Sequence, residues 1–201
     1  MAREFTPRFS ILLQPGATYT HPPAAPEPPE LIDLDDQAIH VMTDFHYVTP
    51  QTVAPDILID DALEQMKTGG VRLLLVINSD REIIGIITAK DIQGERPIKL
   101  AEQTRINRAN ILVSMIMTSQ SDIPVLSMLS VTDAQIGHIV ETLRELERQH
   151  ILVVDIDSGS GKQTVCGVFS TSQISKQLKR DIAPKVTAAH SLSEIVQDVA
   201  E

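Results

Sequence analysis

Short apolar runs and amphipathic segments alternate along most of the chain. In "IDDALEQM", Ile59, Leu63 and Met66 fall on one helical face opposite the acids, and the "GG" that follows is typical of a helix end. The fully apolar "LLLVI" (73–77) predicts a buried strand, "NSDRE" is typical of a turn, and "IIGIIT" predicts the returning strand. The pattern therefore predicts a helix, a β-hairpin and a second helix that begins at "AKDI".

The same order recurs about eighty residues later. "IVETLRELERQ" places Ile139, Leu143 and Leu146 on one face, and "ILVVDI", "DSGSGKQT" and "VCGVFS" read as strand, turn and strand before the helical "TSQISKQLKRDI". Gly85 and Gly167 are 82 positions apart (167 − 85) in this order, and an "MT" dipeptide precedes each copy. Two copies of one helix–strand–strand–helix unit are predicted, in an α+β fold.

The segments outside the two copies differ in composition. Prolines crowd "HPPAAPEPPE", which predicts a mobile or arm-like tail, and this stretch lacks the basic anchor typical of a proline-recognition ligand. "SLSE" is a capping box before an apolar helical pattern near the C-terminus. The predicted organisation is a Pro-rich tail (1–30), a first repeat (31–97), a basic crossover helix (98–116), a second repeat (117–182) and a C-terminal helix (183–201).

Composition narrows the function classes. Apolar residues make up 42% of the 201 residues and aromatics 3%, so the core must consist of Ile, Leu, Val and Met. The formal charge of −10 argues against DNA and anionic membranes as partners, because both need a basic surface. With one cysteine, Cys166, and no apolar run near the roughly 18 residues of a membrane span, the chain is expected to be soluble and cytoplasmic.

The doubled pattern resembles a known family. "MT", "TVAP", "A-L-x-x-M", "VRLLLVI" and "GIITAKD" together are similar to a cystathionine-beta-synthase (CBS) domain, and the series from "MTSQ" through "RQHILVVD" to "GVFSTSQ" resembles another. The likeness covers roughly residues 38–180. It implies a stand-alone tandem pair (a Bateman module) whose repeats pack around a pseudo-two-fold axis, with two clefts that bind adenosine-containing ligands. It also implies a homodimer, for which the helices at 59–68 and 136–148 are the first candidates.

The resemblance places a ribose-binding carboxylate at Asp91, the end of the phrase "T-x-x-D". A carboxylate can accept from two ribose hydroxyls at once, and hydrogen bonds to a charged group contribute about 1.5–3 kcal/mol each. The hydroxyl of Thr88, with nearby helix amides, would suit an oxyanion. The remaining residues expected in this first cleft are Ile86 as apolar wall, Val125 and Leu126 as the opposite wall, and Lys90 and His150 toward the phosphates.

The second copy departs from the family pattern. Ser170 keeps the hydroxyl beside Val168, but Gln173 replaces the carboxylate, so weaker binding or a different ligand is expected in this second cleft. Arg72 occupies the position that corresponds to His150 and could reach an anion there.

Each assignment has a structural alternative. Asp91 could simply stabilise the helix that follows it, by about 0.3–1 kcal/mol, and His150 could be only a helix-end cation. On that alternative the chain is a dimerisation scaffold with vestigial clefts. An enzyme that acts on nucleotides is the weakest hypothesis. The six histidines have no metal-site spacing, no cofactor is implied, Cys166 lies in an apolar strand, and "GSGK" reads as a hairpin turn.

Overall fold

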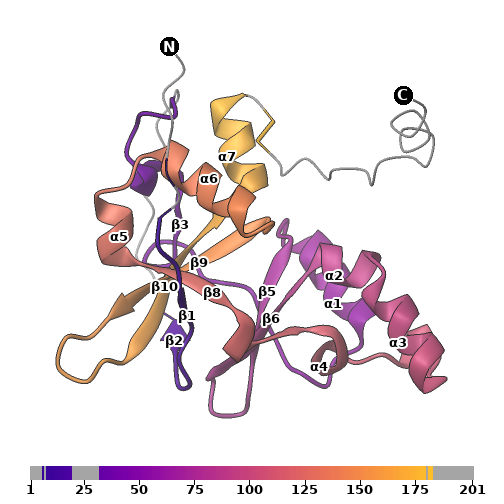
Figure 1. Ribbon diagram of the computed structural model, residues 1–201. Coiled ribbons are helices and arrows are strands. Elements are labelled where there is room, and N and C mark those ends of the chain that lie inside the picture. The colour runs from indigo at the N-terminus through magenta and orange to yellow at the C-terminus, as the bar shows by residue number, and fades with distance from the viewer. Residues whose placement is uncertain (1–5, 7, 20–31, 180, 183–201) are drawn as a thin grey trace, which may run out of the picture.

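The computed structural model describes residues 6, 8–19, 32–179 and 181–182, which form two β-sheets flanked by helices (Figure 1). The first sheet has the order β4-β5-β6-β7, and the second has the order β1-β8-β9-β10-β2 with β3 also paired to β10. The strands of the first sheet are β4 (Thr52–Val53), β5 (Leu73–Ile77), β6 (Ile83–Thr88) and β7 (Thr118–Ser119). Those of the second are β1 (Ile11–Leu12), β2 (Thr18–Tyr19), β3 (Thr43–Asp44), β8 (Pro124–Ser127), β9 (His150–Ile156) and β10 (Gln163–Ser170).

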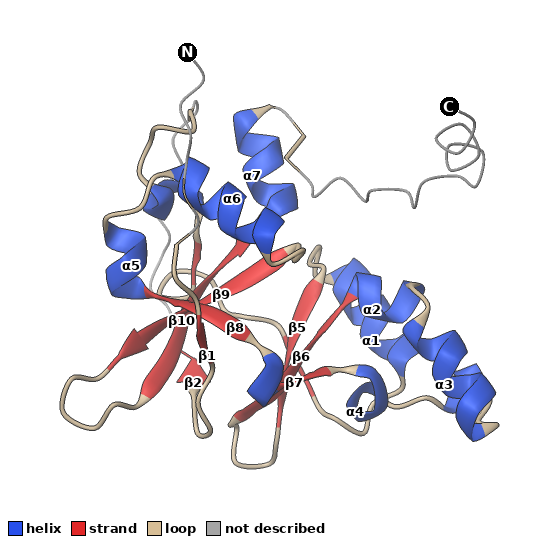
Figure 2. Ribbon diagram, viewed as in Figure 1, coloured by secondary structure: helices blue, strands red, loops and turns tan. Residues whose placement is uncertain are grey.

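Helices cover the outer sides of the two sheets (Figure 2). The first sheet carries α1 (Ile59–Thr68), α2 (Ala89–Gln93), α3 (Arg96–Thr104), η2 (Arg108–Asn110) and α4 (Val113–Ile116). The second carries η1 (Ala38–Val41), α5 (Met128–Thr132), α6 (Ile136–Glu145) and α7 (Thr171–Leu178). The short η3 (Gln120–Asp122) instead contacts β6 of the first sheet and β1 of the second. This α+β architecture of two similar units confirms the predicted fold class, and β5 and β6 coincide with the predicted hairpin strands.

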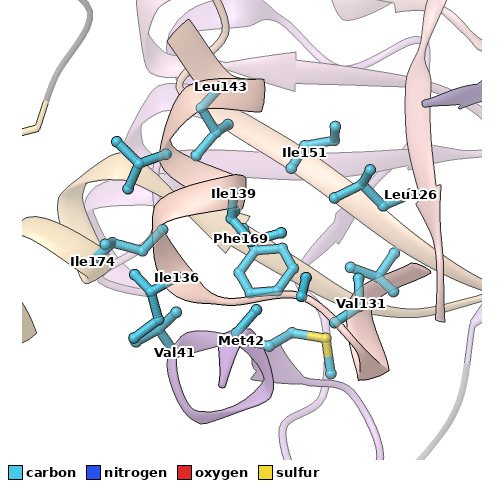
Figure 3. Packing of buried hydrophobic residues seen from close by; sticks show 14 of the residues in the cluster. Val41, Met42, Leu126, Val131, Ile136, Ile139, Leu143, Ile151, Phe169 and Ile174 are labelled. Carbon is cyan, nitrogen blue, oxygen red and sulfur yellow. The ribbon is translucent and has the colours of Figure 1, made fainter. Parts of the chain in front are cut away.

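Three apolar clusters hold the units together. One lies under the helices of each sheet, and a third lies between the sheets, where Leu75 and Ile86 of the first meet Leu152 and Val165 of the second. Figure 3 shows the cluster of the second unit around Phe169. Because the middle cluster takes side chains from both sheets, the two units share one continuous core.

The two units exchange the short elements that precede each repeat. β3 follows the first "MT" but pairs with β10, whereas β7 follows the second "MT" but pairs with β6. Val41 and Met42, at the end of η1, likewise pack in the core of the second unit (Figure 3). The segment that begins the first repeat therefore completes the second unit, and the segment that begins the second repeat completes the first unit. The predicted ranges 31–97 and 117–182 treat each repeat as contiguous and do not include this exchange.

The glycines of the doubled phrase make this exchange sterically feasible. A Cβ on Gly85 would lie 2.7 Å from the Thr118 carbonyl oxygen and 2.8 Å from Met117 Sδ, and one on Gly167 would lie 2.7 Å from Met42 Sδ. Neither position has room for a side chain while the exchanged segment is in place.

Gly85→Ala is expected to lower the free energy of unfolding by about 1–3 kcal/mol, because the obstructing Thr118 carbonyl belongs to a paired backbone. Gly167→Ala is the matched control. It should cost less, because it meets only the flexible end of Met42. Urea unfolding of both variants measures the difference, and an equal or reversed order would contradict the exchanged packing.

Residues 8–19 form an arm, which is one of the two states, mobile or arm-like, that the sequence predicts for the tail. β1 pairs with the outer edge of β8 and β2 with the outer edge of β10, so this arm reaches both edges of the second sheet. Between its strands Leu13 and Ala17 are 3% and 1% exposed in the cluster between the sheets. The side chain of Gln163, buried in β10, accepts from the backbone N–H of Gln14 at 2.6 Å. The arm is integral to the fold.

The crossover between the two repeats is not one continuous helix. The predicted single helix over 98–116 is three elements, α3, η2 and α4, because α3 ends where Arg105 adopts a left-handed backbone conformation with φ of 59°. Residues 1–5, 7 and 20–30 of the predicted Pro-rich tail and the whole predicted C-terminal helix (183–201) lie outside the described residues.

Candidate functional site

A cavity of about 650 Å³ opens between the two units at the carboxyl end of β6. One wall comes from β6, α2 and the start of α3, and the other from the turn between α6 and β9. Five residues expected in the first cleft line it: Ile86, Thr88, Lys90, Asp91 and His150. The structure therefore brings together side chains that are up to 64 positions apart (150 − 86) in the sequence.

Asp91 caps the short helix α2. Its Oδ2 accepts from the Thr88 backbone N–H at 2.9 Å and from the Thr88 hydroxyl at 2.6 Å, while the Thr88 Oγ1 accepts from the Asp91 N–H at 3.2 Å. This reciprocal arrangement is a capping box. Asp91 therefore does stabilise the start of α2, as the structural alternative expects. Because the carboxylate is also 15% exposed and lines the cavity, capping fixes its orientation there without excluding a second role.

Arg96, which the sequence analysis did not single out, is the second charged partner of Asp91. Its Nη1 lies 3.1 Å from Asp91 Oδ1 and donates to the Ile116 carbonyl at 2.9 Å and to Thr118 Oγ1 at 3.3 Å. The guanidinium thereby links the α2 cap to the exchanged strand β7. The sequence signal that could have identified Arg96 is a basic residue five positions after Asp91.

Val125 and Leu126 do not form the opposite wall that was expected. Both are fully buried in β8, Val125 in the cluster between the sheets and Leu126 beneath α6, and neither lines the first cleft. β8 is an interior strand of its sheet because β1 of the arm occupies its outer side. The wall that faces Asp91 is built instead by Leu146, Glu147, Arg148, Gln149 and His150.

A second cavity of about 470 Å³ occupies the corresponding place in the second unit. All four residues expected there, Arg72, Val168, Ser170 and Gln173, line it. Ser170 Oγ accepts from the Gln173 N–H at 3.1 Å, which repeats the bond between Thr88 and Asp91 without the carboxylate. The second cleft also has an apolar wall, formed by Phe45, Val48, Pro50, Val71, Leu73 and Leu75.

The clefts differ in charge. Lys90, Arg96, Lys99 and Arg148 line the first cleft together with the acids Asp91, Glu95 and Glu147. The titratable residues that line the second cleft are Arg72, His150 and Lys176, and no acidic residue is among its described lining residues. The first cleft thus offers mixed charge with a carboxylate, whereas the second offers only positive charge beside its apolar surface.

His150 belongs to both clefts. Burial lowers the pKa of this imidazole to about 4, the nearby Arg72 acts in the same direction, and Asp91 opposes them. The ring is therefore neutral near pH 7, unlike the helix-end cation of the structural alternative. Its Nδ1 is buried and has no hydrogen-bond partner among the described residues, which is uncommon for a buried nitrogen.

A pH titration can test the state of His150. Because its pKa is lower in the folded chain than the ordinary value near 6.5, protons favour the unfolded chain, and stability is lost as pH falls from about 6.5 toward 4. Between pH 7 and pH 5 the loss from this residue should be about 1–2 kcal/mol. His150→Gln should remove that part of the dependence, whereas the exposed His40→Gln should retain it. Identical curves for both variants would contradict a buried neutral imidazole.

The described part of the chain does not support a reactive cysteine, a metal site or a phosphate-binding loop. Cys166 is 1% exposed in β10, and burial raises the pKa of its thiol to about 11, which disfavours the reactive thiolate. No group of three or more His, Cys, Asp or Glu side chains in the described segments is placed to hold a metal ion. "GSGK" lies in the turn between β9 and β10. No helix in the described segments is long and apolar enough to cross a membrane.

The comparisons with known proteins agree with the repeat and the fold. A family model of the CBS domain matches residues 37–96. Among solved structures, an uncharacterized conserved protein from Pyrococcus horikoshii aligns with a TM-score of 0.52 at 23% identity over 74% of this chain and 96% of its own. A conserved CBS-domain protein from Thermoplasma acidophilum aligns with a TM-score of 0.51 at 18% identity over 73% and 71%.

No curated protein matches this sequence. The structural alignments cover both units of this chain, whereas the family model matches residues 37–96 alone. Residues 37–96 carry a CBS domain, and the chain has the fold of a tandem CBS-domain protein.

Proposed function

We propose that this chain is a regulatory, ligand-sensing module that binds an adenosine-containing ligand in the first cleft and signals its occupancy to a partner protein. The observation that carries the proposal is the first cleft itself, where the oriented carboxylate of Asp91, the apolar Ile86 and the cations Lys90 and Arg148 line one cavity between the units.

The chemistry of the first cleft favours an adenosine-containing ligand. Its volume of about 650 Å³ falls in the usual range of about 300–1,000 Å³ for small-molecule sites. Asp91 offers a fixed carboxylate for two ribose hydroxyls, Ile86 offers apolar surface to a base, and Lys90 and Arg148 offer positive charge to phosphates. AMP, ADP, ATP and S-adenosylmethionine all carry the base and the diol.

Signalling would follow from the position of the clefts between the units. A ligand that contacts α2 of the first unit and the α6–β9 turn of the second binds one relative orientation of the units better than others, and so shifts the population toward it. The partner would recognise that orientation. The alternative is a dimerisation scaffold whose clefts bind no ligand.

A thermal-shift panel with AMP, ADP, ATP, S-adenosylmethionine and NAD separates the two functions. A binder at 100 times its Kd stabilises the folded chain by about 2.7 kcal/mol, which corresponds to a Tm increase of about 5–10 °C for a chain of this size. We expect at least one adenosyl ligand to give a concentration-dependent increase. A flat response across the panel would favour the scaffold.

The proposed assembly is a homodimer. A cavity of about 710 Å³ lies between α1, α2 and the α6–β9 turn, and its apolar lining comes from Leu63 and Met66 of α1, Ala89 of α2, and Val71. A second copy could cover this apolar surface, in agreement with the sequence-based choice of helix 59–68. Light scattering at micromolar concentration should give twice the chain mass. A monomer at that concentration would contradict this assembly.

A further inference from the structure

Arg96 is held in place by backbone and side-chain acceptors at the floor of the first cleft. Its Nη1 is within hydrogen-bond or ion-pair distance of three oxygens, on Asp91, Ile116 and Thr118. A guanidinium Nη carries two hydrogens, so this nitrogen cannot fully satisfy three acceptors. One acceptor can therefore leave while Arg96 stays anchored to the Ile116 carbonyl and Thr118.

The rest of the guanidinium has spare donors. Within the described part of the chain, Nη2 and Nε of Arg96 have no hydrogen-bond partner, and the side chain is 47% exposed in the lining of the cleft. Parallel N–H groups of this kind form a fork that matches the oxygens of a phosphate or carboxylate. Arg96 is thus an anchored cation with unused anion-binding capacity next to the carboxylate Asp91.

The second cleft is an internal comparison. Gln173 corresponds to Asp91, and the residue five positions later, Leu178, corresponds to Arg96. Leu178 packs against the core of the second unit. The second cleft therefore lacks the counterparts of both Asp91 and Arg96, and its own guanidinium, that of Arg72, has no carboxylate beside it in the described lining.

We propose that Arg96 determines the specificity of the first cleft, selecting a ligand that carries an anionic group near a vicinal diol. The diol replaces Arg96 as the partner of Asp91 Oδ1, and the anion replaces Asp91 as the partner of Arg96. An uncharged nucleoside makes only the first exchange and leaves the guanidinium without a counter-charge. A cationic adenosyl compound also meets like charge. This inference rests on the proposed function and narrows its ligand class to nucleoside phosphates.

The test is calorimetric titration of the full chain with AMP, adenosine and S-adenosylmethionine. The variants are Arg96→Gln, Arg96→Lys and, as a matched control, Arg144→Gln, which removes an exposed cation that is paired with Glu141 and does not line either cleft. Wild type should prefer AMP to adenosine. Arg96→Gln should weaken the binding of AMP about 10- to 100-fold, and its affinity for adenosine should be equal to or higher than that of wild type. The affinity of Arg96→Lys for AMP should fall between those of wild type and Arg96→Gln, and Arg144→Gln should change each Kd less than about threefold.

The outcomes separate the two proposals. If wild type binds AMP but Arg96→Gln weakens AMP and adenosine equally, or weakens neither, the specificity role of Arg96 is overturned while the ligand-sensing proposal stands. If wild type binds none of the three probes, the ligand-sensing proposal fails and this inference fails with it. A Tm for Arg96→Lys close to that of wild type establishes that the comparison is made on folded protein.

Discussion

Deletion of residues 1–19 is expected to lower the Tm by about 10 °C or more, because the arm is part of the second sheet and of the core between the sheets. The deletion removes the strands on both sheet edges and the buried Leu13 and Ala17. It also removes the bond from the Ile83 N–H to the Ala17 carbonyl at 3.2 Å, which ties the arm to the first unit. Leu13→Ala alone should cost about 2–4 kcal/mol by leaving a cavity between the sheets.

The arm contains its own control. Phe9 is 86% exposed, so Phe9→Ala should change the free energy of unfolding by less than about 0.5 kcal/mol. Urea unfolding of Leu13→Ala and Phe9→Ala measures the contrast. If neither Leu13→Ala nor the deletion lowers stability, the arm is a mobile tail as the sequence predicts, and its pairing with β8 and β10 does not contribute to the fold.

Asp91→Asn is expected to lower the affinity for AMP about 30- to 1,000-fold while the chain stays folded. The amide oxygen of asparagine can still accept from the Thr88 N–H and so preserve much of the α2 cap, but it has no charge to offer the two ribose hydroxyls. The expected loss of about 2–4 kcal/mol of binding free energy corresponds to that range of affinity. Asp91→Ala would also remove the cap and is the less informative variant.

Gln173→Asp provides the reciprocal measurement. This change gives the second cleft the carboxylate that it lacks, beside Ser170, Arg72 and Lys176. A second, weaker AMP site should then be detectable by calorimetry. If Asp91→Asn binds AMP with wild-type affinity, Asp91 acts only as a helix cap, and the ribose-binding role is lost.

The regular elements of the fold could be predicted from the sequence because their signals are local. The β-branched runs of β5 and β6 are separated by a tight polar turn, and α1 has one apolar face. The exchange of β3 and β7 and the pairing of β1 and β2 could not be predicted. These strands are two residues long and too short for a periodic pattern, and their partners lie more than 30 residues away.

The same distinction applies to the candidate site. Thr88 and Asp91 were recognisable because they belong to one short phrase that the local backbone turns into a cap. Val125 and Leu126 were misplaced because the arm that makes β8 an interior strand lies more than 100 residues earlier in the chain. Arg96 was missed because it lies outside the doubled phrase, and its partners Ile116 and Thr118 are 20 and 22 positions later in the sequence.

Calorimetric titration of the wild-type chain with AMP, ADP and ATP tests the central claim most directly. The proposed first cleft predicts saturable binding of at least one of them, with near one tight site per chain, and that site should be absent from Asp91→Asn. Heats no larger than those of dilution for all three nucleotides, in a chain with a cooperative unfolding transition, would contradict the claim and leave the scaffold as the better description of this protein.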